Sequence, residues 1–561
     1  MMKKILKSIA LLLTIVMCAA FIAACSSNDA GKSNTNAGDS PGAGSGSPSA
    51  STSGSGSAAP PPSTSSAPPV DVFVPPPEES KYADHIDIVL DNNTVNIVNQ
   101  FSTAGSVNAT WTYKMILDTL LRDAGGGKQD PDLATRWETD DFKTFRFWLR
   151  DDVYFHNGEK FTANDVLWTI EYAKSEVALG STPNTYWGQV ETATAINDFE
   201  VEIVLKGTNV DYLYYITHPS MGIVNKKAMD ADPEKGMTIG TGCWKLVGYS
   251  TGDYITVERN DDYWGPKAYT KSLTMRYIAE VSTRTIMMQN KECQVCFGIG
   301  SEDLYMFEED TEHYTVFPLT YNNPNTLAFN MNDPICGDYN FRMAISCALI
   351  RDEISIVAAG NWAAPTYWGQ VWGFGTPYFN PNVPEVVEDL ALAKEYLAKS
   401  VYKGEVIEIC CAVETYIRAA EVIQQQLSAI GINTEINRME GPALAAHTDR
   451  DNSKLQIRCY VSSFAMSPAN ARNLFYSTAR SNVMFYNNAR VDEILDQAAI
   501  TVDEDERRAL YYELQEITAA DPPVINTFWR LNGMVGVKGI GGMALTSDNF
   551  FDLRYIYNVI G

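Results

Sequence analysis

Residues 145–166 read FRFWLRDDVYFHNGEKFTANDV, and this stretch predicts three local structures in succession. Its first half alternates apolar and polar side chains, which is typical of a half-buried strand. Asn157-Gly158 is a dipeptide that strongly favours a tight turn. Thr162 stands shortly before the apolar run that begins at Val166 and is a suitable N-cap. The stretch therefore predicts a strand, a turn and a capped helix, so the fold contains both α and β structure.

The segments on either side of this stretch continue the mixed pattern. Apolar residues recur at helical spacing after Thr415, and Gly431 is a natural stop for that helix. Another helix is predicted to start at Asp503 and to end at Pro522-Pro523. Strands are predicted at residues 86–90, 201–205, 255–258, 432–436 and 524–529. We expect a large α/β protein without internal repeats.

The N-terminal 80 residues differ from the rest of the chain. Three lysines precede an apolar stretch that is too short to span a membrane, which is the layout of a signal peptide. The stretch ends at Ala23-Ala24-Cys25 and is similar to a bacterial lipobox, in which Cys25 is acylated. Residues 26–80 are rich in Ser, Gly, Ala and Pro and lack the apolar surface needed to fold. We expect a lipoprotein signal peptide at residues 1–24 and a lipid-anchored, disordered stalk at residues 25–80.

Composition and charge exclude several classes of protein. The 561 residues carry 43 Lys and Arg against 69 Asp and Glu, a formal net charge of -26. This acidic balance repels phosphate backbones, so nucleic acid is not expected as a partner. A hydrophobic fraction of 45% is too high for a disordered protein. The 11 Trp and 29 Tyr suit either stacking on a ligand or filling of a core.

No arrangement of catalytic or metal-binding residues emerges from the sequence. The five histidines do not have metal-ligand spacing, and the nucleophile motif GxSxG is absent. Gly125-Gly126-Gly127-Lys128 lacks the spacing of a phosphate-binding loop and is interpreted as a turn. Cys293 and Cys296 have CxxC spacing, but no second pair accompanies them, and they are interpreted as small core residues. We therefore expect no catalytic residue, metal or cofactor.

Three stretches together resemble one known family. The first is residues 133–166, which include the opening segment. The second is Gly240-Thr241-Gly242-Cys243-Trp244-Lys245-Leu246, followed by Glu258-Arg259-Asn260-Asp261-Asp262-Tyr263-Trp264-Gly265. The third runs from Leu327 through Phe341-Arg342 and Ile350-Arg351-Asp352 to Gly360. They resemble the family-5 extracellular solute-binding proteins of ABC importers, the dipeptide, oligopeptide and nickel class, and the resemblance covers the chain from about residue 86 onward.

This resemblance implies a two-lobed α/β fold of the periplasmic-binding-protein type (type II, cluster C) with an extra subdomain in the first lobe. The lobes are expected at residues 81–315 and 316–522, with residues 523–561 returning to the first lobe. A small solute, a peptide or oligosaccharide or a related compound, would be enclosed between the lobes and delivered to the permease and ATPase subunits. The protein would be a monomer on the extracytoplasmic face of the bacterial cell membrane, anchored through Cys25.

The candidate ligand-binding residues follow from aromatic character and from position in the resemblance. Peptide-binding members of the family place an acidic residue in the region that corresponds to residues 460–468, where it pairs with the ammonium of the peptide. This chain has no Asp or Glu there, which disfavours a peptide with a free amine because its charge would be buried without a partner. The loop at residues 361–372 is instead aromatic and uncharged. The candidates are Trp111, Trp187, Trp362, Trp368, Phe464, Tyr486, Trp529 and Arg530.

Two other functions fit the same sequence. One is a secreted, lipid-anchored hydrolase, for which product formation would be the decisive observation. The other is a signalling or adhesion receptor that has kept the fold, which fold alone does not separate from an importer receptor. Arg530 is a candidate either to pair with a carboxylate of the solute or to bridge the lobes.

Overall fold

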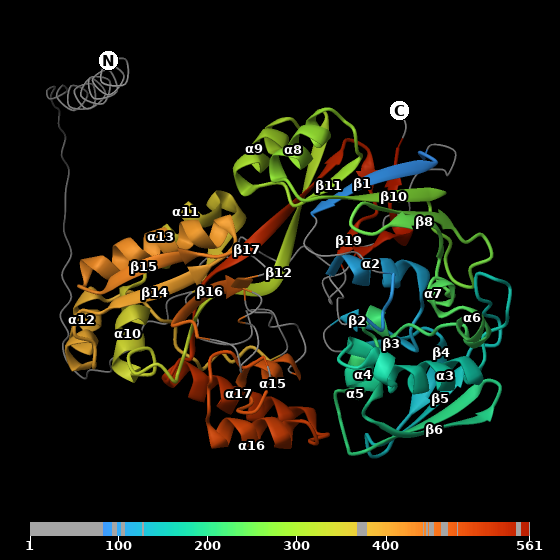
Figure 1. Ribbon diagram of the computed structural model, residues 1–561, viewed down its shortest axis with the longest axis horizontal. Coiled ribbons are helices and arrows are strands. Elements are labelled where there is room, and N and C mark those ends of the chain that lie inside the picture. Colours follow the sequence, from blue (N-terminus) through green and yellow to red (C-terminus); the bar gives the residue numbers. More distant parts are fainter. Residues whose placement is uncertain are drawn as a thin grey trace, which may run out of the picture. The chain divides into compact units, whose positions relative to one another are not determined.

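The computed structural model describes most of the chain after residue 81 (Figure 1). The described residues are 82–91, 98–102, 107–125, 128–366, 378–440, 443–444, 447, 454–461, 469–479, 481–545 and 551–559. The predicted signal peptide, Cys25 and the predicted stalk lie outside this part. None of the described helices is long and apolar enough to cross a membrane.

A large mixed sheet forms the framework of the protein (Figure 1). Its order is β15-β14-β16-β12-β17-β11-β1-β10-β9-β8, and β13 pairs with β17. Along this order the strands are β15 (Asn433–Arg438), β14 (Val406–Cys411), β16 (Ile457–Val461), β12 (Tyr314–Phe329), β17 (Val524–Val537), β11 (Val295–Phe297), β1 (His85–Asp91), β10 (Ser272–Ile278), β9 (Tyr254–Arg259), β8 (Trp244–Ser250) and β13 (Ala363–Pro365). We call the part built on β1 and β8–β11 the first lobe and the part built on β14–β16 the second lobe.

Two long antiparallel strands, β12 and β17, connect the lobes. Their pairing runs from Tyr314 with Val537 to Ala328 with Val524, and it is irregular between Thr320 and Pro324. The carboxyl end of β17 pairs with the first-lobe strand β11, and the carboxyl end of β12 pairs with the second-lobe strand β16. The chain therefore passes between the lobes along β12 and β17, and the irregular pairing marks a place where the sheet can bend.

An inserted subdomain of the first lobe carries a second sheet. Its four antiparallel strands have the order β4-β5-β7-β6. They are β4 (Ala134–Glu138), β5 (Thr144–Leu149), β6 (Val190–Asn197) and β7 (Glu200–Leu205). The opening segment of the sequence lies in this subdomain. It forms the predicted strand, turn and helix, since β5 is followed by a turn in which Gly158 has φ +83° and then by α3 (Ala163–Ala173). The Asp165 carboxylate accepts hydrogen bonds from the backbone N–H and hydroxyl of Thr162, which fixes the start of α3.

Helices and short strands complete the first lobe. The helices are α2 (Val107–Ile116), η2 (Glu176–Ala178), α4 (Thr182–Trp187), α5 (Tyr212–Tyr215), η3 (Pro219–Met221), α6 (Lys226–Ala231), α7 (Pro233–Gly236), α8 (Val281–Gln289), α9 (Ser301–Glu309) and η5 (Leu553–Tyr555). The short strands pair as β2 (Leu121–Gly125) with β3 (Lys128–Pro131), β18 (Ile540–Gly541) with β21 (Tyr557–Asn558), and β19 (Ala544–Leu545) with β20 (Phe551–Asp552).

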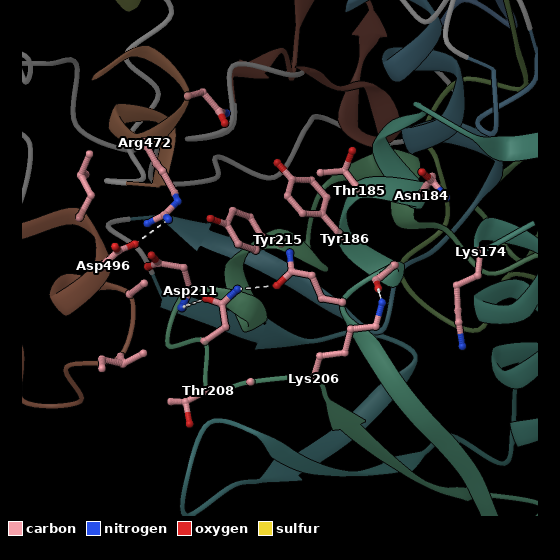
Figure 2. A pocket seen from close by; sticks show the side chains of 18 of the residues that line it. Lys174, Asn184, Thr185, Tyr186, Lys206, Thr208, Asp211, Tyr215, Arg472 and Asp496 are labelled. Atoms are coloured by element: carbon pink, nitrogen blue, oxygen red, sulfur yellow. Dashed lines mark hydrogen bonds and ion pairs between the residues drawn. The ribbon is translucent and has the colours of Figure 1, made fainter. Parts of the chain in front are cut away.

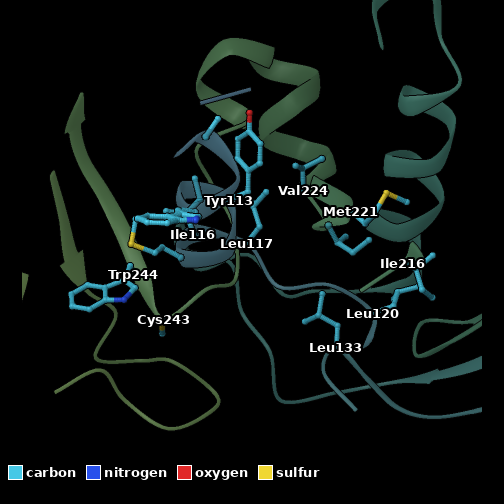
Figure 3. Close-up of a cluster of buried hydrophobic side chains, with 14 of the residues drawn as sticks. Tyr113, Ile116, Leu117, Leu120, Leu133, Ile216, Met221, Val224, Cys243 and Trp244 are labelled. Carbon is cyan, nitrogen blue, oxygen red and sulfur yellow. The ribbon is translucent and has the colours of Figure 1, made fainter. Parts of the chain in front are cut away.

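The motif Gly240-Thr241-Gly242 lies against the end of α2, beside the apolar cluster drawn in Figure 3. A Cβ atom on Gly240 would be 1.9 Å from the carbonyl oxygen of Ile116, and one on Gly242 would be 2.4 Å from that of Met115. The Gly242 N–H donates to the Ile116 carbonyl at 3.1 Å. Both glycines are therefore required for this close backbone approach, which lets Trp244 and Cys243 enter the first-lobe core.

The second lobe packs helices against both faces of its part of the sheet (Figure 1). One face forms a core with α10 (Tyr339–Ala348), α11 (Arg351–Ala359) and α13 (Glu414–Ala429). The other face carries α15 (Ala469–Phe475), α16 (Ala489–Ala498) and α17 (Glu504–Ala520). The remaining helices are η4 (Gly360–Trp362) and α12 (Leu390–Lys399). The predictions of a helix ended by Gly431 and of a helix capped by Asp503 are confirmed.

A buried arginine ties α10 to the end of α17. The Arg342 side chain is 1% exposed, and its guanidinium pairs with the Asp521 carboxylate. It also donates to the backbone carbonyls of Pro522 and Cys336, each at 2.9 Å. These acceptors satisfy a charge that would otherwise be costly to bury.

Candidate functional site

A cavity of about 900 Å³ lies between the inserted subdomain and the second lobe (Figure 2). The first-lobe wall comes from the end of α3, from α4 and the turn after it, and from the segment that joins β7 to α5. The second-lobe wall comes from α15, α16 and α17. The lining residues are Lys174, Asn184, Thr185, Tyr186, Gly188, Gln189, Lys206, Gly207, Thr208, Asn209, Asp211, Tyr215, Arg472, Asn473, Leu495, Asp496, Ala499, Ile500 and Tyr511. The volume suits a small organic molecule.

Two stacked tyrosines form an aromatic wall in this cavity (Figure 2). The rings of Tyr186 on α4 and Tyr215 on α5 are 4.3 Å apart between centroids and are inclined by 13°. In the part of the chain that the structure describes, neither hydroxyl makes a hydrogen bond, and burial raises the pKa of both. The pair therefore presents an apolar face together with two neutral groups that can donate or accept a hydrogen bond.

Most charged side chains around the cavity already have partners. The Lys206 ammonium donates to the Gly188 carbonyl at 2.7 Å. The Arg472 guanidinium and the Asp496 carboxylate form an ion pair at 2.6 Å. These contacts leave hydroxyl and amide groups, rather than unpaired charges, as the main polar groups of the wall.

The two lobes contact each other directly at one side of the cavity. The Val210 N–H, in the first lobe, donates to the Ala499 carbonyl at the end of α16 at 3.1 Å. The carboxylate of Asp211 lies 3.5 Å from the guanidinium of Arg507 on α17. Arg507 also donates to the Tyr378 hydroxyl at 3.0 Å. The Val210–Ala499 and Asp211–Arg507 contacts thus bound the cavity on one side, and they exist only while the lobes are together.

Four of the predicted ligand-binding residues lie in hydrophobic cores. Trp111 packs edge-on against Phe297, with 5.0 Å between ring centroids, and is 5% exposed. Trp187 is fully buried beside Tyr212. Trp362 and Tyr486 are also buried, and burial raises the pKa of Tyr486 to about 12. None of the four lines the cavity of about 900 Å³, although Trp362 lines a smaller cavity between α9 and α11. Their role in binding stays a prediction.

The other predicted site residues have different positions. Trp529 lies half-buried in β17, opposite Pro324 of β12 and Ala364 of β13. The backbone of Arg530 pairs with Ala363, while its side chain is outside the described part. Trp368 and Phe464 fall outside the described residues. Trp529 and Arg530 lie on β17, a strand that connects the lobes, and their contact with a solute stays a prediction.

A cluster of buried charges lies in the first lobe and does not line the cavity. Asp118 accepts hydrogen bonds from Thr241, at 2.9 Å, and from Tyr263 and Trp264. Asp132 accepts from the Thr119 N–H at 3.1 Å. Burial, and to a smaller extent the neighbouring Asp118 carboxylate, raise the pKa of Asp132 to about 7. Arg554 pairs with the buried carboxylate of Asp552. These groups bind one another and hold the motifs of the first lobe together.

The described His, Cys, Asp and Glu side chains do not form a metal-binding cluster. Within the described ranges, no three His, Cys, Asp or Glu side chains gather closely enough to hold a metal ion. His156 is half-buried, contacts the carbonyl of Gly242 through Nε2 at 2.9 Å and accepts from the Gly240 N–H at 3.4 Å. Burial lowers its pKa to about 4. It therefore has a structural hydrogen-bonding role.

The tyrosine pair was not identified from the sequence. Tyr186 stands directly beside the predicted Trp187, but successive residues of a helix point about 100° apart. Trp187 therefore enters the core while Tyr186 faces the cavity. Tyr215 lies 29 positions away in another short helix. The position of Tyr186 on the polar side of α4 could have indicated that it faces the cavity. However, α4 has only six residues, which is too short for a clear helical pattern in the sequence.

The chain is similar in sequence and in structure to several known solute-binding proteins. The glutathione-binding protein GsiB of Escherichia coli O6:K15:H31 is 25% identical over 437 residues, which are 74% of this chain and 83% of that protein. The structure of the substrate binding protein CtaP of Listeria monocytogenes superimposes with a TM-score of 0.76 at 23% identity, over 85% of this chain and all of that one. DppA of Helicobacter pylori, in complex with the peptide STSA, gives a TM-score of 0.73 at 22% identity, over 86% and 99% of the two chains.

These structures share the fold of two-lobed periplasmic binding proteins, so the predicted fold class is confirmed. The sequence model for "Bacterial extracellular solute-binding proteins, family 5 Middle" matches residues 128–485. This match spans the inserted subdomain, which contains the opening motif, and most of the second lobe. The chain therefore belongs to the family-5 bacterial extracellular solute-binding proteins.

Proposed function

We propose that this protein captures a small organic solute between its two lobes and delivers it to the permease and ATPase subunits of an ABC importer. The observation that carries the proposal is the cavity of about 900 Å³ whose walls come from both lobes. A solute there would contact both walls and favour the state in which the lobes are together. Membership of the solute-binding family supports the same function.

The proposed solute is a compound with apolar or neutral polar faces, such as a peptide without a free amine or an oligosaccharide. The stacked tyrosines and the neutral amides and hydroxyls of the cavity suit such a molecule. Relatives bind solutes of diverse chemistry: GsiB is named for glutathione, and solved structures hold a tetrapeptide and a nickel–histidine complex. The residue set of the cavity favours a non-metal solute, since it contains neither His nor Cys.

We further propose that the protein acts on the extracytoplasmic face of the membrane, held there by a lipid on Cys25. The support is the sequence pattern around Cys25 and the stalk-like composition of the residues after it. Metabolic labelling with a fatty-acid analogue tests this proposal. Label is expected on the full chain and is expected to be absent from a Cys25→Ala variant.

A thermal-shift screen tests the importer function. The purified chain is heated with glutathione, with pools of di- to pentapeptides in free and N-acetylated form, with oligosaccharides and with nickel–histidine. A solute that binds the folded protein raises the melting temperature according to its concentration and Kd. At least one organic class should bind and remain chemically unchanged. Product formation from a bound compound would instead favour a hydrolase, and a screen without any binder would contradict the receptor function.

A further inference from the structure

A second cavity, of about 310 Å³, lies beside the strands that connect the lobes, and we call it the hinge cavity. One wall is α9 of the first lobe, which contributes Tyr305 and Glu308. The other wall consists mainly of α11 and η4 of the second lobe, which contribute Val357 and Trp362. Figure 1 shows α9 and α11 on the side of β17 that faces away from α15–α17. Like the cavity of about 900 Å³, the hinge cavity has a wall in each lobe.

The two cavities lie on opposite faces of the large sheet. On β11, Cys296 packs into the cluster that contains Trp362 and residues of α9. Its neighbours Val295 and Phe297 pack into the first-lobe core on the other face, which also contains Trp187 of α4. In the second lobe, α11 covers one face and α15–α17 cover the other. The hinge cavity therefore lies behind the sheet as seen from the proposed solute.

The hinge cavity is level with the part of β12 and β17 that can bend. Trp362 directly precedes β13, whose Ala364 pairs with Trp529 of β17. Trp529 is also the partner of Pro324, where the irregular part of the pairing between β12 and β17 ends. Bending at this place changes the angle between the lobes, and with it the distance between α9 and α11.

In this structure the lobes touch on the solute side and leave a cavity on the other face. The Val210 N–H donates to the Ala499 carbonyl on the solute side. On the other face, Tyr305 and Val357 are 55% and 51% exposed, so the hinge cavity is open to solvent. Because the two faces lie on opposite sides of the bend, separation of the lobes at the solute brings α9 and α11 together. The side chains of the hinge cavity then limit this movement, since packed atoms resist overlap.

We propose that the hinge cavity sets the affinity for the solute, because its side chains limit how far the lobes separate. The inference rests on the proposed receptor function and assigns affinity-determining residues to the face away from the solute. When the open state is favoured, closure costs free energy and the apparent affinity falls. A larger side chain at Val357 leaves less room for the open state, so it lowers this cost and strengthens binding.

Val357→Trp tests the inference, with Ile356→Trp as its matched control. Ile356 precedes Val357 on α11, is 64% exposed and is not among the described residues that line the hinge cavity. Isothermal titration with a solute found in the screen should give a Kd at least about fivefold lower for Val357→Trp than for wild type. Ile356→Trp should bind like wild type. An unchanged or higher Kd for Val357→Trp, or an equal decrease in both variants, would overturn the inference.

Hydrogen exchange of the Val210 amide gives a readout that needs no solute. Its hydrogen bond to Ala499 exists only while the lobes are together, so a shift toward closure slows the exchange. In protein without solute, Val357→Trp should slow it by a factor similar to the decrease in Kd. Unchanged exchange would overturn the inference and leave the receptor function intact. A screen without any binder would instead contradict the receptor function, and this exchange would still decide whether the hinge cavity controls closure.

Chemical modification of a Val357→Cys variant covers the case in which the tryptophan disturbs the fold. The eight cysteines that the structure describes are buried, so methanethiosulfonate reagents should react with the introduced thiol of the folded protein. Methyl, propyl and benzyl reagents fill the hinge cavity progressively, and the Kd should fall as the group becomes larger. Wild-type protein treated with the same reagents reports any reaction at other cysteines. A Kd that does not depend on the size of the group would overturn the inference.

Discussion

The carboxylate of Asp211 lies 3.5 Å from the guanidinium of Arg507, and the two residues belong to different lobes. Only 10% of the Asp211 side chain and 17% of the Arg507 side chain are exposed. Burial raises the pKa of Asp211, and Arg507 only partly offsets this effect. The pair is therefore desolvated when the lobes meet, and each charge needs the other in that state.

Removing one member of this pair should weaken solute binding by disfavouring closure of the lobes. Asp211→Asn leaves Arg507 without its carboxylate, and Arg507→Gln leaves Asp211 without its cation, so each change disfavours closure. We expect about tenfold weaker binding, equivalent to about 1.4 kcal/mol. The double variant should recover most of the loss because it buries no charge. Isothermal titration with the best solute measures all four proteins.

A neighbouring arginine provides the control for this cycle. Arg508 forms its ion pairs with Glu504 and Asp505 within the same helix, and 88% of the Asp505 side chain is exposed. Exposed pairs contribute about 0–1 kcal/mol, so Arg508→Gln should leave the Kd unchanged. Additive losses in the Asp211 and Arg507 double variant would show that the two residues do not act as a pair.

The Val210 amide should report lobe closure by hydrogen exchange. Its hydrogen bond goes to Ala499 of the other lobe, so separation of the lobes exposes it to solvent. We expect saturating solute to slow its exchange at least tenfold. The Leu205 amide donates to Lys143 inside the first lobe and should change little. Equal slowing of the two amides would indicate general stabilisation instead of closure.

The hydroxyls of the tyrosine pair should affect binding but not stability. Tyr215→Phe keeps the ring stacked on Tyr186 and removes a hydroxyl that has no partner within the described structure. If this group binds the solute, the Kd should rise by about two- to tenfold, as expected for a lost hydrogen bond of about 0.5–1.5 kcal/mol. The melting temperature should stay the same.

Tyr263→Phe is the matched control for that change. Its hydroxyl donates to the buried Asp118 carboxylate at 3.2 Å, so its removal should lower stability and leave the Kd unchanged. Wild-type affinity of the Tyr215→Phe variant would show that the Tyr215 hydroxyl does not bind the solute.

The local elements of the fold could be predicted because their signals are local. Alternation, the Asn157-Gly158 turn, the Thr162 cap and Gly431 each act through a few neighbouring residues. β17 is longer than predicted, since it runs past Trp529 to Val537. Its second half contains Asn532, Gly533 and Gly536, which weaken a strand pattern, and pairing with β12 and β11 stabilises it instead.

The candidate site was less predictable because it depends on long-range packing. Aromatic content singled out tryptophans, yet Trp111, Trp187 and Trp362 fill cores. The aromatic content of a sequence does not distinguish a ring that fills a core from a ring that lines a cavity. The wall that the structure places between the lobes combines short helices of the inserted subdomain with α15–α17, which are more than 250 positions away in the sequence. No periodicity or spacing in the sequence indicates that these two sets of helices lie together.

Asp132 should make the protein lose stability as the pH rises. Burial raises its pKa to about 7 in the folded chain, against about 3.9 for an aspartate exposed to water. The folded state therefore binds more protons than the unfolded state between these values, and stability falls with pH in that window. The contribution is complete below about pH 4 and lost above about pH 7.

Asp132→Asn should flatten this dependence, because the amide cannot ionise and its oxygen can still accept from the Thr119 N–H. Urea unfolding at pH 5 and pH 8 measures the effect. The variant should gain stability relative to wild type on going from pH 5 to pH 8, by up to about 3 kcal/mol, because about two pH units lie between pH 5 and the folded pKa and each is worth about 1.4 kcal/mol. Asp130→Asn, at an exposed carboxylate paired with Arg122, should follow the wild-type profile. Parallel profiles for wild type and Asp132→Asn would show that Asp132 stays ionised in the folded protein, so that the first-lobe cluster holds its full negative charge.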